Sequence, residues 1–325
     1  MATIRDVAKL AGVGLGTASR VLSGSGSVSE SAKLAVQDAV RKLNFRPSST
    51  ARALSKRQSG IIGVLAPLFH GYYYATAISL TERQIRSAGK HMVLMSSRGE
   101  KDSRWDDARG LASLMERNCD GILILGTALS ERELLAAAIQ GPAIAILNRR
   151  INALDEACFS IDHFAAGRAV GQHMLAQGHR QFATITGPMD IEDARLRHEG
   201  FVGALSERGV ALDPALIVEG NYEMEGGELG AAVLLSAGRP FTGLFCGNDE
   251  TAISAKNSLK RAGINPYIVG YDNMSLLDYA GIEISSVEVP IADLVSNACA
   301  YLLNRCYGVE GAVSRAFSAR LIVRG

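Results

Sequence analysis

From residue 61 onward, short apolar runs alternate with stretches of helical periodicity, and this alternation limits the possible folds more than any other feature. The runs that we interpret as strands are 61–66, 91–96, 121–125, 143–147, 157–161, 181–186, 242–246, 267–271 and 319–323. Runs that are apolar on both faces and separated by helices indicate parallel sheets buried under helices on either side. We therefore expect an α/β body of doubly wound parallel sheets, with ligands bound beyond the carboxyl ends of the strands.

The length and composition of the chain exclude several classes of protein. With 325 residues it is about twice a typical domain, and 47% hydrophobic with 21% charged residues indicate an ordinary globular protein. The apolar runs are far shorter than the roughly 20 residues that cross a bilayer, and no secretory signal is visible, so we expect a cytoplasmic protein without a membrane partner. The five widely spaced cysteines include no CxxC pair, which argues against a disulfide framework and a structural zinc site.

The charge is distributed unevenly. Residues 1–60 carry ten basic and three acidic side chains, whereas the remaining residues carry 24 basic and 30 acidic ones. A basic segment joined to an acidic body is typical of a protein in which one small domain binds a polyanion. The alternative is that this charge only keeps the protein soluble.

The basic segment has the pattern of a helix-turn-helix domain. Thr3 and Asp6 have capping-box spacing at the start of a first helix, and Gly12 separates it from a second short helix. Ser29 is placed to cap a third helix. The sequence therefore predicts an all-α head whose second helix enters a major groove, although any other three-helix bundle would give a similar pattern.

A short basic segment, 46–56, follows the predicted head. Leu54 is its one large apolar residue. A helix of about two turns is marginal in water, so this segment needs a partner to fold. A leucine without a core could wedge between base pairs in a minor groove. A plain interdomain linker is the alternative.

Polar and aromatic residues follow the predicted strands of the body. Those directly after strands are Asn148, Arg149, Asn248, Asp249 and Asp272. Planar amides and carboxylates can bind neighbouring hydroxyl groups in pairs, and the tyrosines at 72–74 and 222 can stack on a sugar ring. Arg197 adds a fixed fork of donors. Such residues also cap helices in many α/β proteins, and this purely structural role is the alternative for each one alone.

Several of these segments together resemble the LacI/GalR family of sugar-responsive transcription repressors. In the first part of the chain they are residues 3–13, 17–22, 46–47 and 51–54, and in the body 176–180, 187–188, 194–197, 247–249 and 269–272. Segments 70–71 and 147–150 are most similar to the galactose and β-glucoside regulators of that family. The resemblance implies a homodimer on double-stranded operator DNA. It also implies a core like that of periplasmic sugar-binding proteins, with two α/β subdomains, three crossovers and a sugar effector between them.

The resemblance also implies domain boundaries and site residues. The domains are a helix-turn-helix head at 1–46, a hinge at 47–59 and a core at 60–325, with subdomains of about 60–158 plus 290–316 and 162–286 plus 318–325. The implied DNA-binding residues are Thr3, Leu15, Gly16, Thr17, Ser19, Arg20, Ser29, Ala51 and Leu54. The implied effector-binding residues are Tyr73, Asn148, Arg197, Tyr222, Asn248 and Asp272.

Departures from the family pattern leave the ligand and the operator open. Gly16 has no side chain that can bond to a base edge, so Arg20 becomes the strongest candidate for a bidentate contact to guanine. Asn273 stands where the family usually has Asp.

Two other functions are compatible with parts of the chain. A solute-binding or transport module would explain the body but not the basic head. An enzyme is disfavoured because the sequence has no HExxH, GxSxG or P-loop motif, and we expect no cofactor and no metal.

Overall fold

The structure is a computed structural model, and it describes residues 2–23, 27–45, 58–96, 103–126 and 128–324. Tertiary contacts divide the chain into two compact units, which we call the head (Met1–Gly60) and the body (Ile61–Gly325). Each is described by itself below.

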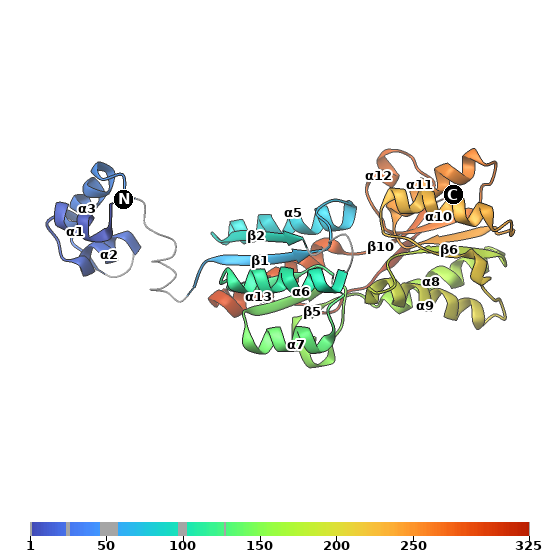
Figure 1. The fold of residues 1–325 in the computed structure, drawn as a ribbon, viewed down its shortest axis with the longest axis horizontal. Coiled ribbons are helices and arrows are strands. Elements are labelled where there is room, and N and C mark those ends of the chain that lie inside the picture. Colours follow the sequence, from blue (N-terminus) through green and yellow to red (C-terminus); the bar gives the residue numbers. More distant parts are fainter. Residues whose placement is uncertain (1, 24–26, 46–57, 97–102, 127, 325) are drawn as a thin grey trace. The chain divides into compact units, whose positions relative to one another are not determined.

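The head is a three-helix unit built around a small apolar core. Its helices are α1 (Ile4–Leu10), α2 (Leu15–Ser23) and α3 (Glu30–Lys42) (Figure 1). Thr3 and Asp6 form the expected capping box at the start of α1, and Ser29 caps α3 by accepting a hydrogen bond from the amide of Ala32. Gly12 turns the chain between α1 and α2 with a φ of 64°, a conformation that glycine adopts without steric cost. The predicted all-α head is confirmed.

The body contains two sheets, which define a first and a second lobe (Figure 1). The first-lobe sheet has the order β2-β1-β3-β4-β5, and its strands are β1 (Ile61–Ala66), β2 (His91–Ser96), β3 (Gly121–Ile124), β4 (Ala143–Leu147) and β5 (Cys158–Phe159). The second-lobe sheet has the order β11-β10-β9-β8-β6-β7, and its strands are β6 (Phe182–Thr186), β7 (Ile217–Glu219), β8 (Gly243–Cys246), β9 (Tyr267–Asp272), β10 (Ser285–Glu288) and β11 (Arg320–Ile322).

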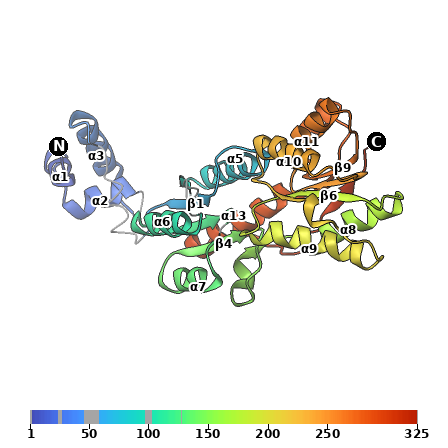
Figure 2. The ribbon, with the colours of Figure 1, turned by 45° about the vertical axis from the view of Figure 1, so that its right-hand side comes forward.

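Helices cover both faces of each sheet (Figures 1 and 2). The first lobe carries α5 (Tyr72–Ser87), α6 (Ser103–Glu116), α7 (Glu131–Gln140) and α13 (Ile291–Tyr307). The second lobe carries α8 (His163–Ala176), α9 (Glu192–Ser206), α10 (Met224–Ser236), α11 (Asp249–Arg261) and α12 (Leu276–Tyr279). Short 3-10 helices are η1 (Asn152–Ala157) and η2 (Pro214–Leu216).

The alternation of side chains along the strands explains this layering. In β1, Val64 belongs to a buried apolar cluster with residues of α5 and α13. Its neighbour Leu65 belongs to a second buried cluster, with residues of α6 and α7. In β8, Phe245 packs with α8 and α9, and Leu244 packs with α10 and α11. Successive strand residues point to opposite faces, so a run that is apolar throughout needs cover on both sides.

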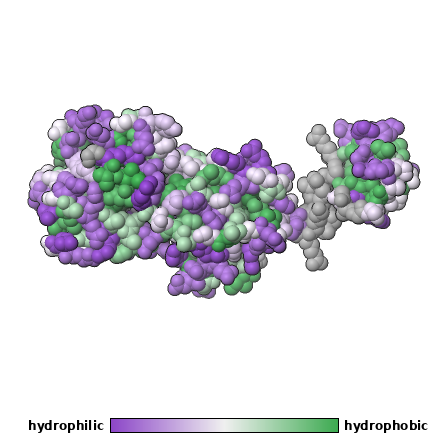
Figure 3. Space-filling view, turned by 180° about the vertical axis from the view of Figure 1, so that it is seen from behind, coloured by the Kyte–Doolittle hydropathy of each residue, from purple (hydrophilic) through white to green (hydrophobic). Residues whose placement is uncertain are grey.

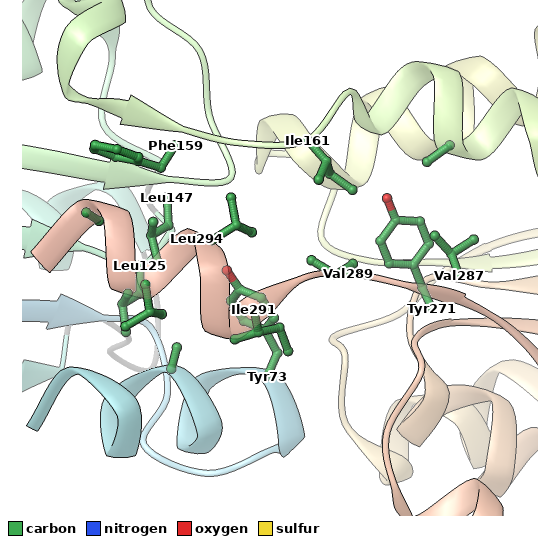
Figure 4. Close-up of a cluster of buried hydrophobic side chains, with 14 of the residues drawn as sticks. Tyr73, Leu125, Leu147, Phe159, Ile161, Tyr271, Val287, Val289, Ile291 and Leu294 are labelled. Atoms are coloured by element: carbon green, nitrogen blue, oxygen red, sulfur yellow. The ribbon is translucent and has the colours of Figure 1, made fainter. Parts of the chain in front are cut away.

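Three connections join the lobes: β5 to α8, β10 to α13, and α13 to β11. One buried apolar cluster runs through both lobes along these connections. Figure 4 shows Val287, Val289 and Ile291 following one another along the second connection, with Tyr271 on one side and Leu294 of α13 on the other. The expected α/β architecture of two doubly wound sheets is therefore confirmed.

The strand prediction is wrong at three places. The edge strand β7 is missing from it because it has only three residues, of which Ile217 is exposed. β10 is missing because its sequence, SSVE, is polar, yet Ser285 and Ser286 are buried and hydrogen bonded. β11 runs antiparallel to β10, so the second sheet is not purely parallel.

Hydrophilic side chains cover most of the face of the body drawn in Figure 3, with small apolar patches between them. This is the surface expected when the apolar residues fill the clusters between sheets and helices. Within the described residues, no helix has the length and apolar character needed to cross a membrane.

Candidate functional site

The helix α2 presents the predicted base-reading residues on its outer face. Leu15 is 46% exposed, and Gly16, Ser19 and Arg20 are also exposed, whereas Ala18 is buried in the head. Nε of Arg20 donates a hydrogen bond to the carbonyl oxygen of Gly16, 3.3 Å away. A Cβ atom added at Gly16 would lie 3.8 Å from the guanidinium of Arg20, an ordinary contact distance, so the arginine lies directly over this glycine.

Other predicted DNA-binding residues have local structural roles or lie outside the described chain. The hydroxyl of Thr3 donates to Asp6 and accepts from its amide, and the hydroxyl of Ser29 accepts from the amide of Ala32. Both residues remain exposed at helix starts. Ala51 and Leu54 lie outside the described residues, as does most of the predicted hinge at 47–59.

The body encloses a cavity of about 260 Å³ where the carboxyl ends of strands from both lobes meet. Its lining contains all six predicted effector-binding residues: Tyr73 at the start of α5, Asn148 after β4, Arg197 in α9, Tyr222 before α10, Asn248 after β8, and Asp272 at the end of β9. The structure therefore brings together residues that are up to 199 positions apart in the chain.

Arg197 forms the centre of a buried polar network. Its Nη2 donates to Oδ2 of Asp193 at 2.5 Å, and its Nη1 donates to the carbonyl oxygen of Gly247 at 2.8 Å. Its guanidinium carbon lies 3.9 Å from the centre of the Tyr271 ring. Arg197 and Asp193 are 5% and 6% exposed, so this ion pair is shielded from bulk water.

Asn248 and Tyr222 hold each other in place. The Asn248 side chain accepts from the amide of Thr251, which caps α11, and donates to the carbonyl oxygen of Tyr222 at 2.8 Å. Tyr222 has a φ of 68°, an uncommon value for an aromatic residue and a mark of local strain at a site. Its ring lies against Gly187, where an added Cβ would be 2.1 Å from the ring.

Several buried polar atoms of the cavity lining have no hydrogen-bond partner within the described structure. They are the hydroxyl oxygens of Tyr73 and Tyr222, Oδ1 of Asn148 and Asp272, and Nε of Arg197. A buried polar atom without a partner destabilises the fold by about 1–3 kcal/mol. Both acceptors and donors are present, so a ligand with several hydroxyl groups is chemically matched to the set.

Burial also changes the acidity of two carboxyl groups of the second lobe, that of Asp272 in the cavity lining and that of Asp249 outside it. It raises the pKa of Asp272 to about 7, against the opposing effect of the Arg197 charge. Burial raises the pKa of Asp249 to about 8, although the carboxylate accepts hydrogen bonds from the hydroxyl of Ser286 and the amide of Met274. Among the described residues, no cluster of three or more His, Cys, Asp or Glu side chains could hold a metal ion.

The sequence-based prediction missed several residues of the cavity, above all Asp193 and Glu250. Asp193 lies in the first turn of α9, where an acidic residue also suits the helix dipole, yet it is buried and paired with Arg197. The i,i+4 spacing of the two residues was the signal that could have revealed the pair. Glu250 joins the lobes, because its Oε2 accepts a hydrogen bond from the amide of Tyr72 at 3.0 Å.

Comparisons with known proteins find matches for both the head and the body. Residues 3–48 match the family model "Bacterial regulatory proteins, lacI family", and residues 172–325 match the "Periplasmic binding protein-like domain". The chain is 30% identical to the HTH-type transcriptional regulator AscG of Escherichia coli (strain K12), over 100% of this chain and 98% of AscG.

Solved structures give the same result. A complex of the transcriptional regulator CelR with cellobiose matches at a TM-score of 0.69 and 25% identity, over 100% of this chain and 99% of that one. The fold is also that of the Lac repressor dimer bound to operator and an anti-inducer, with a TM-score of 0.83 and 22% identity over 99% of this chain and 98% of that one.

Proposed function

The chain belongs to the LacI family of bacterial regulatory proteins, and from this premise we propose how its head and body divide the work of a transcription regulator. The head reads operator DNA, and the body binds a sugar-like effector that controls the affinity of the head for DNA. We propose no catalytic role, no cofactor and no metal. The protein acts in the cytoplasm, where its DNA is.

The proposed DNA contacts follow from the exposure of α2. Arg20 is the residue that forms two hydrogen bonds with a guanine, after its bond to the carbonyl of Gly16 is released. Leu15 and Gly16 contact base edges, and Thr17 and Ser19 lie near phosphates. Thr3 and Ser29 approach phosphates at the starts of their helices, where backbone amides favour anions. Ala51 and Leu54 are proposed to contact the minor groove.

The proposed effector site is the cavity of the body, and the observation that carries it is the set of buried, unpartnered polar atoms in one lining. Hydroxyl groups of a sugar both donate and accept, so they can bond with Tyr73, Asn148, Arg197, Tyr222 and Asp272 at once. Asn248 makes one bond within the protein at each end of its amide, which fixes its orientation, and its second N–H can still donate to the effector.

We propose a homodimer as the DNA-binding species. A helix-turn-helix protein gains affinity and specificity when two heads bind half-sites one helical turn apart. The Lac repressor, which shares the fold, is a dimer on its operator. Coupling of about 1–3 kcal/mol between cavity and head would change DNA affinity by about 5- to 150-fold.

A thermal-shift panel of sugars tests the proposed effector site. A sugar that binds the folded body stabilises it by mass action, by about 2.7 kcal/mol at a concentration one hundred times its Kd. This gain in stability raises the melting temperature. In Asn148→Gly the amide is lost while the backbone keeps its φ of 58°, so the shift should fall. The matched control is Asn118→Gly, at an exposed residue with a φ of 54° outside the cavity lining.

The proposal makes two demands on the panel. At least one sugar must stabilise the protein. The Kd of that sugar must rise tenfold or more in Asn148→Gly and stay unchanged in Asn118→Gly. A panel in which no sugar has an effect, or in which both variants behave alike, contradicts the proposed effector site.

A further inference from the structure

The cavity of the body has an unusual balance of charges. Arg197 is the one lysine or arginine among the described residues that line it. The same lining includes the carboxyl groups of Asp193, Glu223, Glu225, Glu250 and Asp272. A cavity with this lining has a negative potential, which disfavours the entry of an anion.

The single arginine is already engaged. A guanidinium usually binds a phosphate or carboxylate through two parallel N–H groups. In this structure Nη2 of Arg197 donates to Asp193 at 2.5 Å and Nη1 donates to the carbonyl oxygen of Gly247 at 2.8 Å. One face of the group is covered by the ring of Tyr271, 3.9 Å away. Among its three nitrogens only Nε has no partner within the described structure. The two terminal nitrogens are already held by Asp193 and Gly247, so a parallel two-bond contact with an anion would compete with these bonds.

Asp193 makes the binding of an anion beside Arg197 still less favourable. It is 6% exposed, so its charge is poorly screened by water and acts at short range on any group that approaches Arg197. An incoming phosphate would have to lose its own hydration and meet a carboxylate at the one cation of the lining. A hydroxyl group carries no such penalty, because it can donate to a carboxylate and accept from Nε.

We propose that the effector of this protein carries no negatively charged group, and that Asp193 is the residue that imposes this selectivity. The effector class is an unphosphorylated, uncharged sugar, as opposed to a sugar phosphate or a sugar acid. This inference rests on the proposed role of the cavity as the effector site, and it makes Asp193 a determinant of specificity.

Inorganic phosphate is a probe that does not depend on knowing the effector. The full chain is titrated with sodium phosphate at constant ionic strength, and binding is followed by isothermal titration calorimetry. The variant Asp193→Asn frees Arg197 from its counter-charge, and we expect it to bind phosphate at least tenfold more tightly than the unchanged protein. The matched control is Glu199→Gln, which removes an exposed carboxylate from the same helix.

The basic head is present in every one of these proteins, so phosphate bound there cancels in the comparison. Equal phosphate affinity of the unchanged protein and Asp193→Asn would overturn the proposal, and so would a gain of the same size in Glu199→Gln. Asp193→Ser serves as a second variant in case Asn in this position disturbs folding, and near-ultraviolet circular dichroism identifies any unfolded variant.

A second measurement separates this inference from the proposed function. Each sugar of the thermal-shift panel is paired with its own 6-phosphate on the unchanged protein. Stabilisation by the neutral member alone supports the inference, and equal or greater stabilisation by the phosphate overturns it. If neither member of any pair binds, the proposed sugar site fails, while the phosphate titration still decides the role of Asp193.

Discussion

The head and the body present their candidate binding residues in opposite ways. In the head, Leu15 and Arg20 are exposed, and the hydrogen bond that Arg20 forms reaches only four residues back along its helix. In the body, Arg197 is buried and bonds to Gly247, 50 residues further on. A surface site can thus change its contacts without changing the fold, whereas the cavity is part of the structure that stabilises the body. Substitutions should therefore separate binding from stability in the head, but not at the paired residues of the cavity such as Arg197.

The largest expected effect is in the body. Arg197→Met leaves Asp193 buried without its cation, and removing one partner of a buried ion pair usually costs about 3–5 kcal/mol. The control is Arg195→Met on the same helix, where the arginine is 44% exposed and the change should stay within about 0.5 kcal/mol. Denaturant unfolding of both variants measures the difference, and equal losses would remove the distinction between buried and exposed sites.

A close backbone contact gives the next largest effect. In Gly187→Ala the new Cβ would lie 2.1 Å from the ring of Tyr222, so the ring must move and the free energy of unfolding should fall by about 1–3 kcal/mol. Gly203→Ala is the control, because its nearest neighbour is 3.8 Å away and alanine favours the helix by up to about 1 kcal/mol. Unfolding curves for the two variants should shift in opposite directions. A neutral Gly187→Ala would show that Tyr222 is not tightly held.

In the head we expect a substitution to have a small effect on stability and a large effect on DNA binding. Arg20→Ala should change stability by less than about 0.5 kcal/mol, yet weaken binding to a selected duplex by about 1–3 kcal/mol at one base of each half-site. Arg41→Ala on α3 removes the same charge from an exposed residue and should act equally on all sequences. Anisotropy titrations with selected and random duplexes compare the two. Equal losses on both duplexes for Arg20→Ala would refute its role in reading bases.

The response to pH should also differ between the two units. Burial raises the pKa of Asp249 to about 8, above its value of about 3.9 in the unfolded chain, so the native body keeps a proton that the unfolded chain releases. Stability of the body should therefore decline as pH rises from about 4 toward 8. In the head, hydrogen bonds from Thr3 and from Lys42 lower the pKa of the exposed Asp6 and Asp38, so its stability should instead fall slightly on acidification.

Asp249→Asn tests this difference most simply. It should flatten the decline of body stability by up to about 1.4 kcal/mol per pH unit and leave the acid sensitivity of the head unchanged. Urea unfolding at a series of pH values, with separate probes for the two units, measures both slopes. An unchanged slope in the body would show that Asp249 is ionised when buried.

The sequence-based predictions succeeded where the cause is local. The capping box at Thr3, the cap at Ser29 and the apolar runs of most strands depend on neighbours within a few residues, and the structure has them as expected. They failed where a distant partner decides. In β10 the polar Ser286 is buried against Asp249, 37 residues away. Asp193 has the spacing to pair with Arg197, but this pair lies buried in the cavity because Arg197 also contacts Gly247 and Tyr271. No local pattern contains these distant contacts.

The central claim is that a small molecule in the cavity of the body controls the binding of DNA by the head. Its most direct test is the affinity of the full chain for a duplex selected from a random pool, measured by fluorescence anisotropy with and without a sugar that stabilises the protein. We expect the sugar to change the Kd by about 5- to 150-fold, and Asn148→Gly to abolish this change while it keeps the affinity for DNA. A Kd that is the same at saturating sugar, or a change that persists in Asn148→Gly, would contradict the account.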